Sequence, residues 1–115
     1  MTVDKDVLQK VEKQFLLEAA LSELAALLGH TLCDPLSSEL FCLESGLSLA
    51  KRDKVVHYLQ SLVPTTSEIK LVTLKRSVLK LVPELSNYAD PVFNGLLKIL
   101  IKEFAIELNI LGLKS

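Results

Sequence analysis

Leucine spaced every three or four residues is the feature of this sequence that most restricts its fold. The 115-residue chain contains 26 leucines. Over residues 6–28 the apolar side chains recur at helical spacing, which predicts an amphipathic helix. They are Val7, Leu8, Val11, Phe15, Leu17, Leu21, Leu24 and Leu28. Gly29 follows where a left-handed residue commonly ends a helix.

Local signals divide the remainder into four further predicted helices. Asp34-Pro35 is typical of a helix start, because aspartate accepts from free amides and proline suits the first turn. We expect that helix to end near Ser45-Gly46 and to turn Leu36, Leu40, Phe41 and Leu43 inward. The others are predicted at 48–62, 66–81 and 91–111, the last opening on Asp90-Pro91. The spacing of Thr65 and Glu68 suggests a capping box for the fourth.

The last predicted helix, 91–111, is apolar around most of its circumference. Such a helix must be central, or must meet a partner on a second face. Aromatic residues make up only 5% of the chain, and Gly and Pro number four each, which disfavours a turn-rich β-sandwich. We therefore expect one all-α domain over residues 1–115. Its five helices would form a compact bundle in which the long first and last helices supply much of the core, with a helical-hairpin array as the structural alternative.

The fourth helix is the one most open to another interpretation. Residues 69–74 contain β-branched side chains and could form a short strand. Because the sequence shows no evident partner strand, the helix is favoured there.

Charge is divided along the chain although the formal net charge is only −1. Residues 1–48 carry eight acidic and three basic side chains. Residues 49–82 carry two acidic and seven basic side chains, and residues 83–115 carry four acidic and three basic ones. The first segment is thus acidic and the second basic. Such a chain can attract its own other half, a second copy or a charged partner. No stretch of 18 residues lacks a charge, so we expect no transmembrane helix, and an intracellular, cytoplasmic protein.

Residues that could carry chemistry are few. His30, Cys33, Cys42 and His57 are the candidate zinc ligands, but their spacing lacks a tight Cys-x2-Cys pair, and no metal or other cofactor is expected. A Cys33–His30 nucleophile pair lacks an orienting third residue. Glu103 and Glu107 stand one helical turn apart without the Glu-x-x-His pair of di-iron sites, which favours a solvated row. We expect no enzyme.

Three functions are compatible with these patterns. The favoured one is a helical protein–protein interaction module, as an adaptor, a homo-oligomer or a small subunit, because one small domain cannot bury so much leucine internally. Its candidate partner-binding residues are Phe93, Leu97, Leu100, Phe104 and Leu108.

The first alternative is a nucleic-acid-binding regulator with residues 66–81 as recognition helix. It would use Lys51, Arg52, Lys54, Lys70, Lys75, Arg76 and Lys80, and the same side chains could instead meet an acidic protein surface or the acidic first segment. A pI near 6.1 and the scarcity of aromatic residues beside these bases disfavour nucleic acid. The second alternative is a carrier of apolar ligands inside the bundle.

Overall fold

The computed structural model describes residues 5–66 and 68–113, and within them the chain is all-α, as predicted. Five α-helices carry the fold: α1 (Lys5–Leu27), α2 (Ser38–Ser45), α3 (Leu49–Leu62), α4 (Leu71–Leu81) and α5 (Asp90–Glu103). A 3-10 helix, η1 (Pro83–Asn87), joins α4 to α5. Two three-residue strands, β1 (Glu68–Lys70) and β2 (Asn109–Leu111), complete the described elements.

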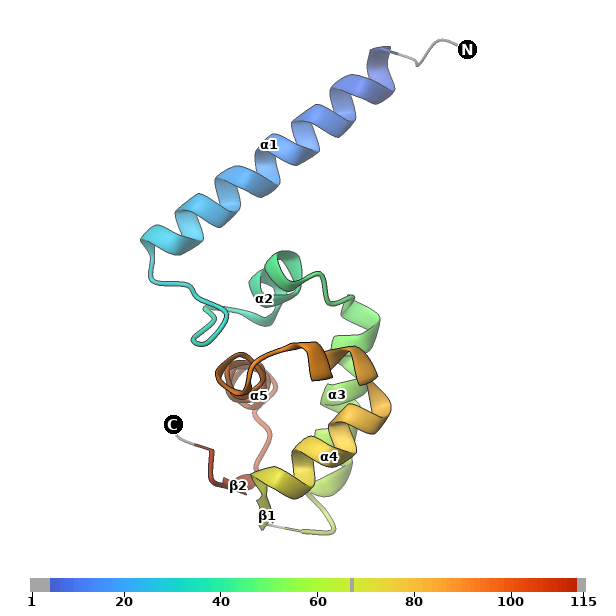
Figure 1. Cartoon of the computed structure of the whole chain (residues 1–115), viewed down its shortest axis with the longest axis vertical. Helices are drawn as coiled ribbons and strands as arrows, with labels where there is room; N and C mark the ends of the chain where they lie inside the picture. The colour runs from blue at the N-terminus through green and yellow to red at the C-terminus, as the bar shows by residue number, and fades with distance from the viewer. Residues whose placement is uncertain (1–4, 67, 114–115) are drawn as a thin grey trace.

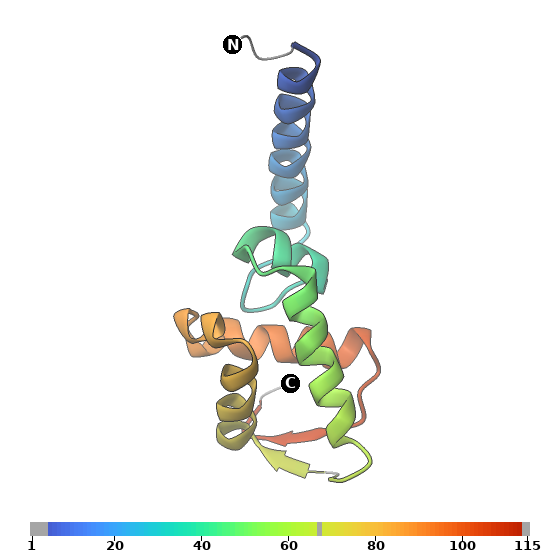
Figure 2. The ribbon, with the colours of Figure 1, turned by 90° about the vertical axis from the view of Figure 1, so that its right-hand side faces the viewer.

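Helix α5 lies at the centre of a body formed by α2 to α5, and it crosses α3 and α4 (Figure 2). Six of its residues are buried. Five of the six, all except Gly95, form one core cluster with Phe41 of α2, with Val55 and Leu59 of α3, and with Leu74 and Val78 of α4. The prediction that the last helix is central is confirmed, and the remaining helices enclose it on several sides.

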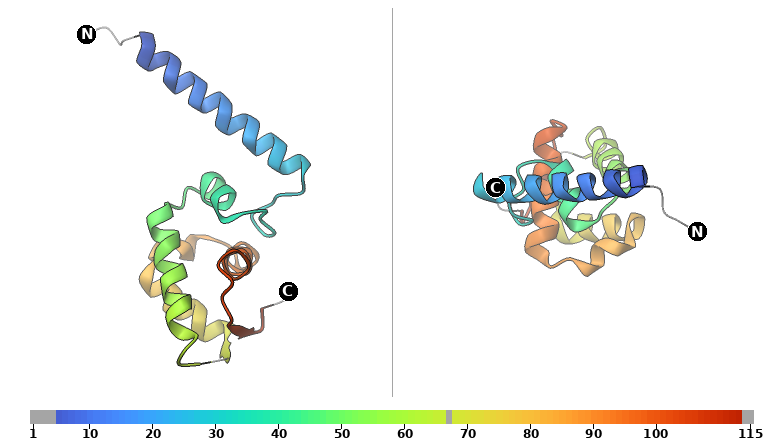
Figure 3. Two further views of the ribbon diagram at one scale, coloured as in Figure 1. Left: turned by 180° about the vertical axis from the view of Figure 1, so that it is seen from behind. Right: turned by 90° about the horizontal axis from the view of Figure 1, so that it is seen from above.

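Helix α1 projects from this body and overhangs it (Figures 1 and 3). Of its described residues only Ala25 is buried, and the hydrophobic core cluster draws its side chains from residue 41 onward. The prediction that the first helix supplies much of the core is therefore wrong. The buried side chains of α5 are instead covered by α2, α3 and α4.

The end of α1 agrees with the prediction from Gly29. Its φ of 94° is left-handed, a region that glycine enters without a steric penalty. The amides of Gly29 and His30 donate to the carbonyls of Ala26 and Ala25, which satisfies carbonyls at the helix end.

Helix α2 starts later than predicted. Ser37, and not Asp34, caps it: the Ser37 hydroxyl accepts from the amide of Leu40 at 3.1 Å. Asp34 and Pro35 belong to the loop between α1 and α2. Leu36 and Leu43 are exposed by 47% and 38%. The prediction that these two side chains turn inward is therefore wrong.

Helix α5 ends at Glu103, eight residues before the predicted boundary. Ala105 is left-handed with φ 49°, and the amide of Ile106 donates to the carbonyl of Ile101. Beyond this turn, Ile106, Leu108 and Ile110 are buried while the residues between them are exposed. This alternation is strand spacing, and it leads into β2.

Strand β2 pairs in parallel with β1, with Ile110 opposite Ile69. Residues 68–70 are therefore a strand. The strand alternative for residues 69–74 is confirmed for Ile69 and Lys70 and wrong for residues 71–74, which belong to α4. Because Glu68 lies in β1, it does not form the predicted capping box; Thr65 instead donates its hydroxyl to the carbonyl of Leu62. Residue 67, also within the predicted helix, lies outside the described residues.

The loop from α1 to α2 crosses α5 at Gly95. A Cβ atom built at Gly95 would lie 2.6 Å from the carbonyl oxygens of both Leu32 and Cys33. Only glycine leaves room for that backbone crossing. Gly95 thus sets how closely the loop that carries α1 lies against the body.

Replacing Gly95 with alanine tests this crossing. We expect Gly95→Ala to lower the free energy of unfolding by about 1–3 kcal/mol, because backbone atoms must move to admit the methyl group. Urea denaturation followed by circular dichroism measures the change. The neighbouring Asn94→Ala variant should shift stability by less than about 0.5 kcal/mol, and an equal loss in both variants would contradict the steric explanation.

Candidate functional site

The five residues predicted to bind a partner belong mainly to the core. Phe93, Leu97 and Leu100 are fully buried, Leu108 is 8% exposed, and Phe104 is partly buried against the core. Their assignment to an outer surface is therefore corrected. Helix α5 is apolar around most of its circumference because helices of its own chain cover that part, which was the other outcome the pattern allowed.

Most of the exposed large apolar side chains lie instead on α1. Large hydrophobic side chains along this helix are each at least half exposed: Val7, Leu8, Val11, Phe15, Leu16, Leu17, Leu21, Leu24 and Leu27. Leu28, just after it, is 74% exposed. Surface this apolar and continuous usually marks a contact with another molecule. The sequence contained this signal, but the helix was interpreted as core.

The α1 helix presents two apolar faces and not one stripe. Successive helical residues turn by about 100°, which places Leu8, Val11 and Phe15 within about 60° of one another. Leu17, Leu21 and Leu24 form a second group that is centred on the order of 140° away. A partner that covers α1 must therefore contact it on two sides.

The base of α1 is held against α2 by a buried histidine. The His30 side chain accepts a hydrogen bond at Nδ1 from the amide of Leu36, at 3.0 Å. Its Nε2 is fully buried and lies 3.4 Å from Glu44 Oε2 on α2, outside hydrogen-bond geometry. Together with buried Ala25, these contacts set the direction in which α1 leaves the body.

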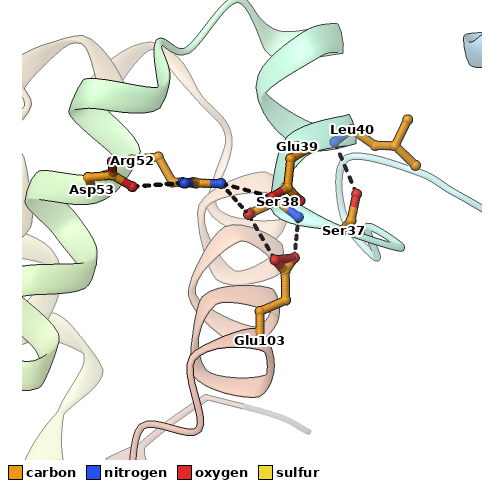
Figure 4. A network of polar contacts seen from close by, with 7 residues as sticks. All are labelled: Ser37, Ser38, Glu39, Leu40, Arg52, Asp53 and Glu103. Carbon is orange, nitrogen blue, oxygen red and sulfur yellow. Dashed lines mark hydrogen bonds and ion pairs between the residues drawn. The ribbon is translucent and has the colours of Figure 1, made fainter.

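A polar network joins α2, α3 and α5 below this attachment (Figure 4). The amide and hydroxyl of fully buried Ser38, the first residue of α2, both donate to the Glu103 carboxylate. Arg52 donates to the Ser38 hydroxyl at 3.1 Å, and to Glu39 and Asp53. Glu103 thus places a negative charge at the positive end of the α2 dipole. Glu103 and Glu107 are both exposed, as the interpretation of a solvated row expects, but the Glu103 carboxylate is in addition the acceptor of this network.

Three of the seven basic side chains proposed to contact nucleic acid or an acidic partner form ion pairs within the chain. Lys51 forms an ion pair with Glu84, Arg52 with Glu39 and Asp53, and Lys75 with Asp90. In residues 5–66 and 68–113, no ion pair is found for the other four, Lys54, Lys70, Arg76 and Lys80. The basic segment is thus partly neutralised by its own chain.

The predicted recognition helix also departs from helix-turn-helix geometry. Such motifs join their two helices by a turn of three or four residues. Here the eight residues 63–70, which include β1, separate α3 from α4.

The four candidate metal ligands lie apart. His30 is buried beside α2, Cys42 belongs to the core, and Cys33 and His57 are exposed on the loop and on α3. Across the part of the chain that the structure describes, no three His, Cys, Asp or Glu side chains gather as a metal site would require. Burial raises the pKa of the Cys42 thiol, with nearby Arg52 opposing that effect.

No protein-family model, curated protein or solved structure matches this chain. Within the described residues, no helix combines the length and the apolar character needed to cross a membrane.

The network at Ser38 predicts that removing the Glu103 carboxylate destabilises the folded chain. We expect Glu103→Ala to lower the free energy of unfolding by about 1–2 kcal/mol, because buried donors of Ser38 lose their acceptor. Urea denaturation measures this loss. The control Glu107→Ala, at an exposed position of the same segment, should change stability by less than about 0.5 kcal/mol. Equal effects from the two variants would be inconsistent with the network.

The two thiols should react at different rates. Ellman's reagent at pH 8 should label Cys33 in the folded chain at least about 100-fold faster than Cys42, because the thiolate is the reactive species and burial disfavours it. Cys33→Ser and Cys42→Ser variants assign the two phases.

The raised pKa of Cys42 also gives a pH dependence with a definite sign. Above the usual thiol pKa of about 8.5, the Cys42 thiol loses its proton more readily in the unfolded chain than in the folded one. The free energy of unfolding therefore falls as pH rises. A Cys42→Ser variant should lose this alkaline part of the stability profile. Rapid labelling of both thiols in the folded chain would contradict the burial of Cys42.

Proposed function

We propose that this chain is a non-enzymatic helical protein–protein interaction module whose docking element is α1. The observation that supports the proposal is the exposure of large apolar side chains along one 23-residue helix. Covering a single leucine or phenylalanine contributes about 1.5–3 kcal/mol, so covering several would drive tight association.

The length of α1 supports the same proposal. At 1.5 Å per residue it extends about 34 Å, and its outer part has no contact with the core cluster. Most helical stability in proteins comes from packing of the apolar face and not from propensity. A partner that packs along α1 would supply that stabilisation, which a solvated helix lacks.

The body of the molecule supplies a rigid base for this element. The Ser38–Arg52–Glu103 network fixes α2, and α2 holds the end of α1 through Ala25 and His30. A helix presented at a fixed angle loses less conformational freedom on binding than a free one. In this proposal the packed body orients α1, and α1 binds the partner.

The double variant Phe15→Glu/Leu21→Glu, with one change on each face of α1, tests the proposal. Tagged chain is used to recover partners, including second copies, from the cell of origin, and the recovered protein is then titrated against purified variants. We expect binding at least about a hundredfold weaker in the double variant, because two buried apolar anchors are replaced by charges.

Leu49→Glu/Leu81→Glu is the matched control, since these two leucines on the body are exposed by 51% and 43%. It should bind like the natural chain. Equal binding by all three proteins, or no association of any kind, would overturn the proposal.

A further inference from the structure

A surface groove lies between α4 and α5. It has a volume of about 470 Å³ and is lined by Leu71, Val72, Lys75, Arg76 and Leu79 of α4 and by Asp90 and Asn94 of α5. Lys75 is paired with Asp90, so Arg76 is the lining cation for which no ion pair is found in the described residues. Val72 is 70% exposed, so the groove leaves a large apolar side chain uncovered. A groove of this kind fits a segment that presents apolar side chains together with carboxylates.

One face of α1 has this composition. Leu8, Val11 and Phe15 lie on it, and Glu12 and Glu18 flank them, each within about 70° of its centre by helical rotation. Phe15 is 69% exposed and Val11 59%. We call these five residues the acidic face.

The basic residues in the middle of α1 lie elsewhere on the helix. Lys10 and Lys13 are more than about 130° from the centre of the acidic face. Between residues 8 and 18 the charge on α1 is therefore sorted: Glu12 and Glu18 accompany the acidic face, and Lys10 and Lys13 accompany the other apolar face. This sorting gives the acidic face a sign opposite to that of Arg76, the groove cation for which no ion pair is found in the described residues.

The chain's own α1 does not lie in this groove. Its C-terminal end is fixed at α2 by Ala25 and His30, whereas α4 begins beside β1, at the far end of the body (Figure 1). The helix also runs away from α4 (Figures 1 and 2). The groove and the acidic face can meet only between two molecules.

We propose that the occupant of the α4–α5 groove is the acidic face of α1 from a second copy of this chain. The inference rests on the proposed function, because it names the partner of the docking helix. Phe15 and Val11 cover Val72 and Leu79, and Glu12 and Glu18 approach Arg76 and the neighbouring Lys80. If the exchange is reciprocal it closes a two-fold dimer, and if not it continues to larger assemblies.

The surface area is consistent with this exchange. The chain exposes 7786 Å², about a quarter more than the roughly 6,200 Å² expected for a compact monomer of its mass. Its radius of gyration is 16.9 Å, against about 13 Å for a compact domain of this length. A stable interface takes about 800 Å² from each partner, so the surplus is sufficient for one.

Charge reversal on the full chain tests the pairing. Light scattering after size exclusion, over micromolar to submillimolar concentrations, should show self-association that weakens as salt is raised. Arg76→Glu and, separately, Glu18→Lys should each weaken it at least tenfold. The chain that carries both changes should regain most of the loss. Circular dichroism verifies that each exposed-site variant is folded.

Lys10→Glu is the matched control, because it reverses a charge of α1 away from the acidic face. Self-association unchanged by Lys10→Glu supports the proposal. A monomer at every concentration, or a double reversal no better than the single ones, overturns it.

Disulfide trapping locates the contact. Phe15→Cys and Val72→Cys are placed in separate Cys33→Ser chains, which are mixed and oxidised. We expect the main product to be the crossed dimer, in which position 15 of one chain is joined to position 72 of the other. If only chains carrying the change at position 15 couple with one another, α1 pairs with α1 and the proposed site is overturned.

The two proposals fail in different ways. A monomeric chain whose α1 still binds a different protein, and loses it in the Phe15→Glu/Leu21→Glu variant, overturns the second copy as occupant and retains the docking helix. A chain with no α1-dependent association overturns both.

Discussion

The need to bury the apolar side chains of α5 determines how the rest of the molecule is arranged. With Phe93, Leu96, Leu97 and Leu100 fully buried, this helix is stable only when it is enclosed. Helices α2, α3 and α4 supply that cover, and the segment after Glu103 adds Ile106 and Ile110. Once these side chains are covered, α1 has no part in burying them. The apolar side chains of α1 are left outside for that reason, and the exposed helix and the packed body have one cause.

The direction of α1 is set by contacts that are small in number and mostly polar. The loop after α1 crosses α5 where Gly95 has no side chain, and His30 is fixed between the Leu36 amide and Glu44. Below them, Glu103 and Arg52 meet at buried Ser38 and tie α2 to α5 and α3. A docking helix that leaves such a base keeps its orientation before it binds, which reduces the entropy lost on association.

The division of charge along the sequence acquires a spatial meaning in this arrangement. Some of the basic side chains of α3 and α4 are neutralised within the body, as the pair between Lys75 and Asp90 illustrates. Arg76 remains beside an apolar groove, and the carboxylates of Glu12 and Glu18 accompany one apolar face of α1. Within one molecule Glu39 of the acidic segment pairs with Arg52 of the basic segment, whereas α1 is attached at α2 and runs away from α4. Attraction between the carboxylates of α1 and the basic side chains of α4 is thereby expected between molecules. Such an interface would respond to both apolar substitution and ionic strength.

Local sequence by itself determined the class of the fold and the termination of α1 at Gly29, since these depend on neighbours in sequence. For the last helix it determined only that most of its circumference must be covered. Alternation at Ile106, Leu108 and Ile110 also marked a strand, but the apolar content of this segment favoured a longer helix in the interpretation. Only the tertiary structure decided which apolar helix is buried. Periodicity says that a face must be covered, whereas what covers it depends on which elements fit around α5 at close packing density. The placement of Glu103 under α2, and of α1 outside the core, follows from that packing and from no local pattern.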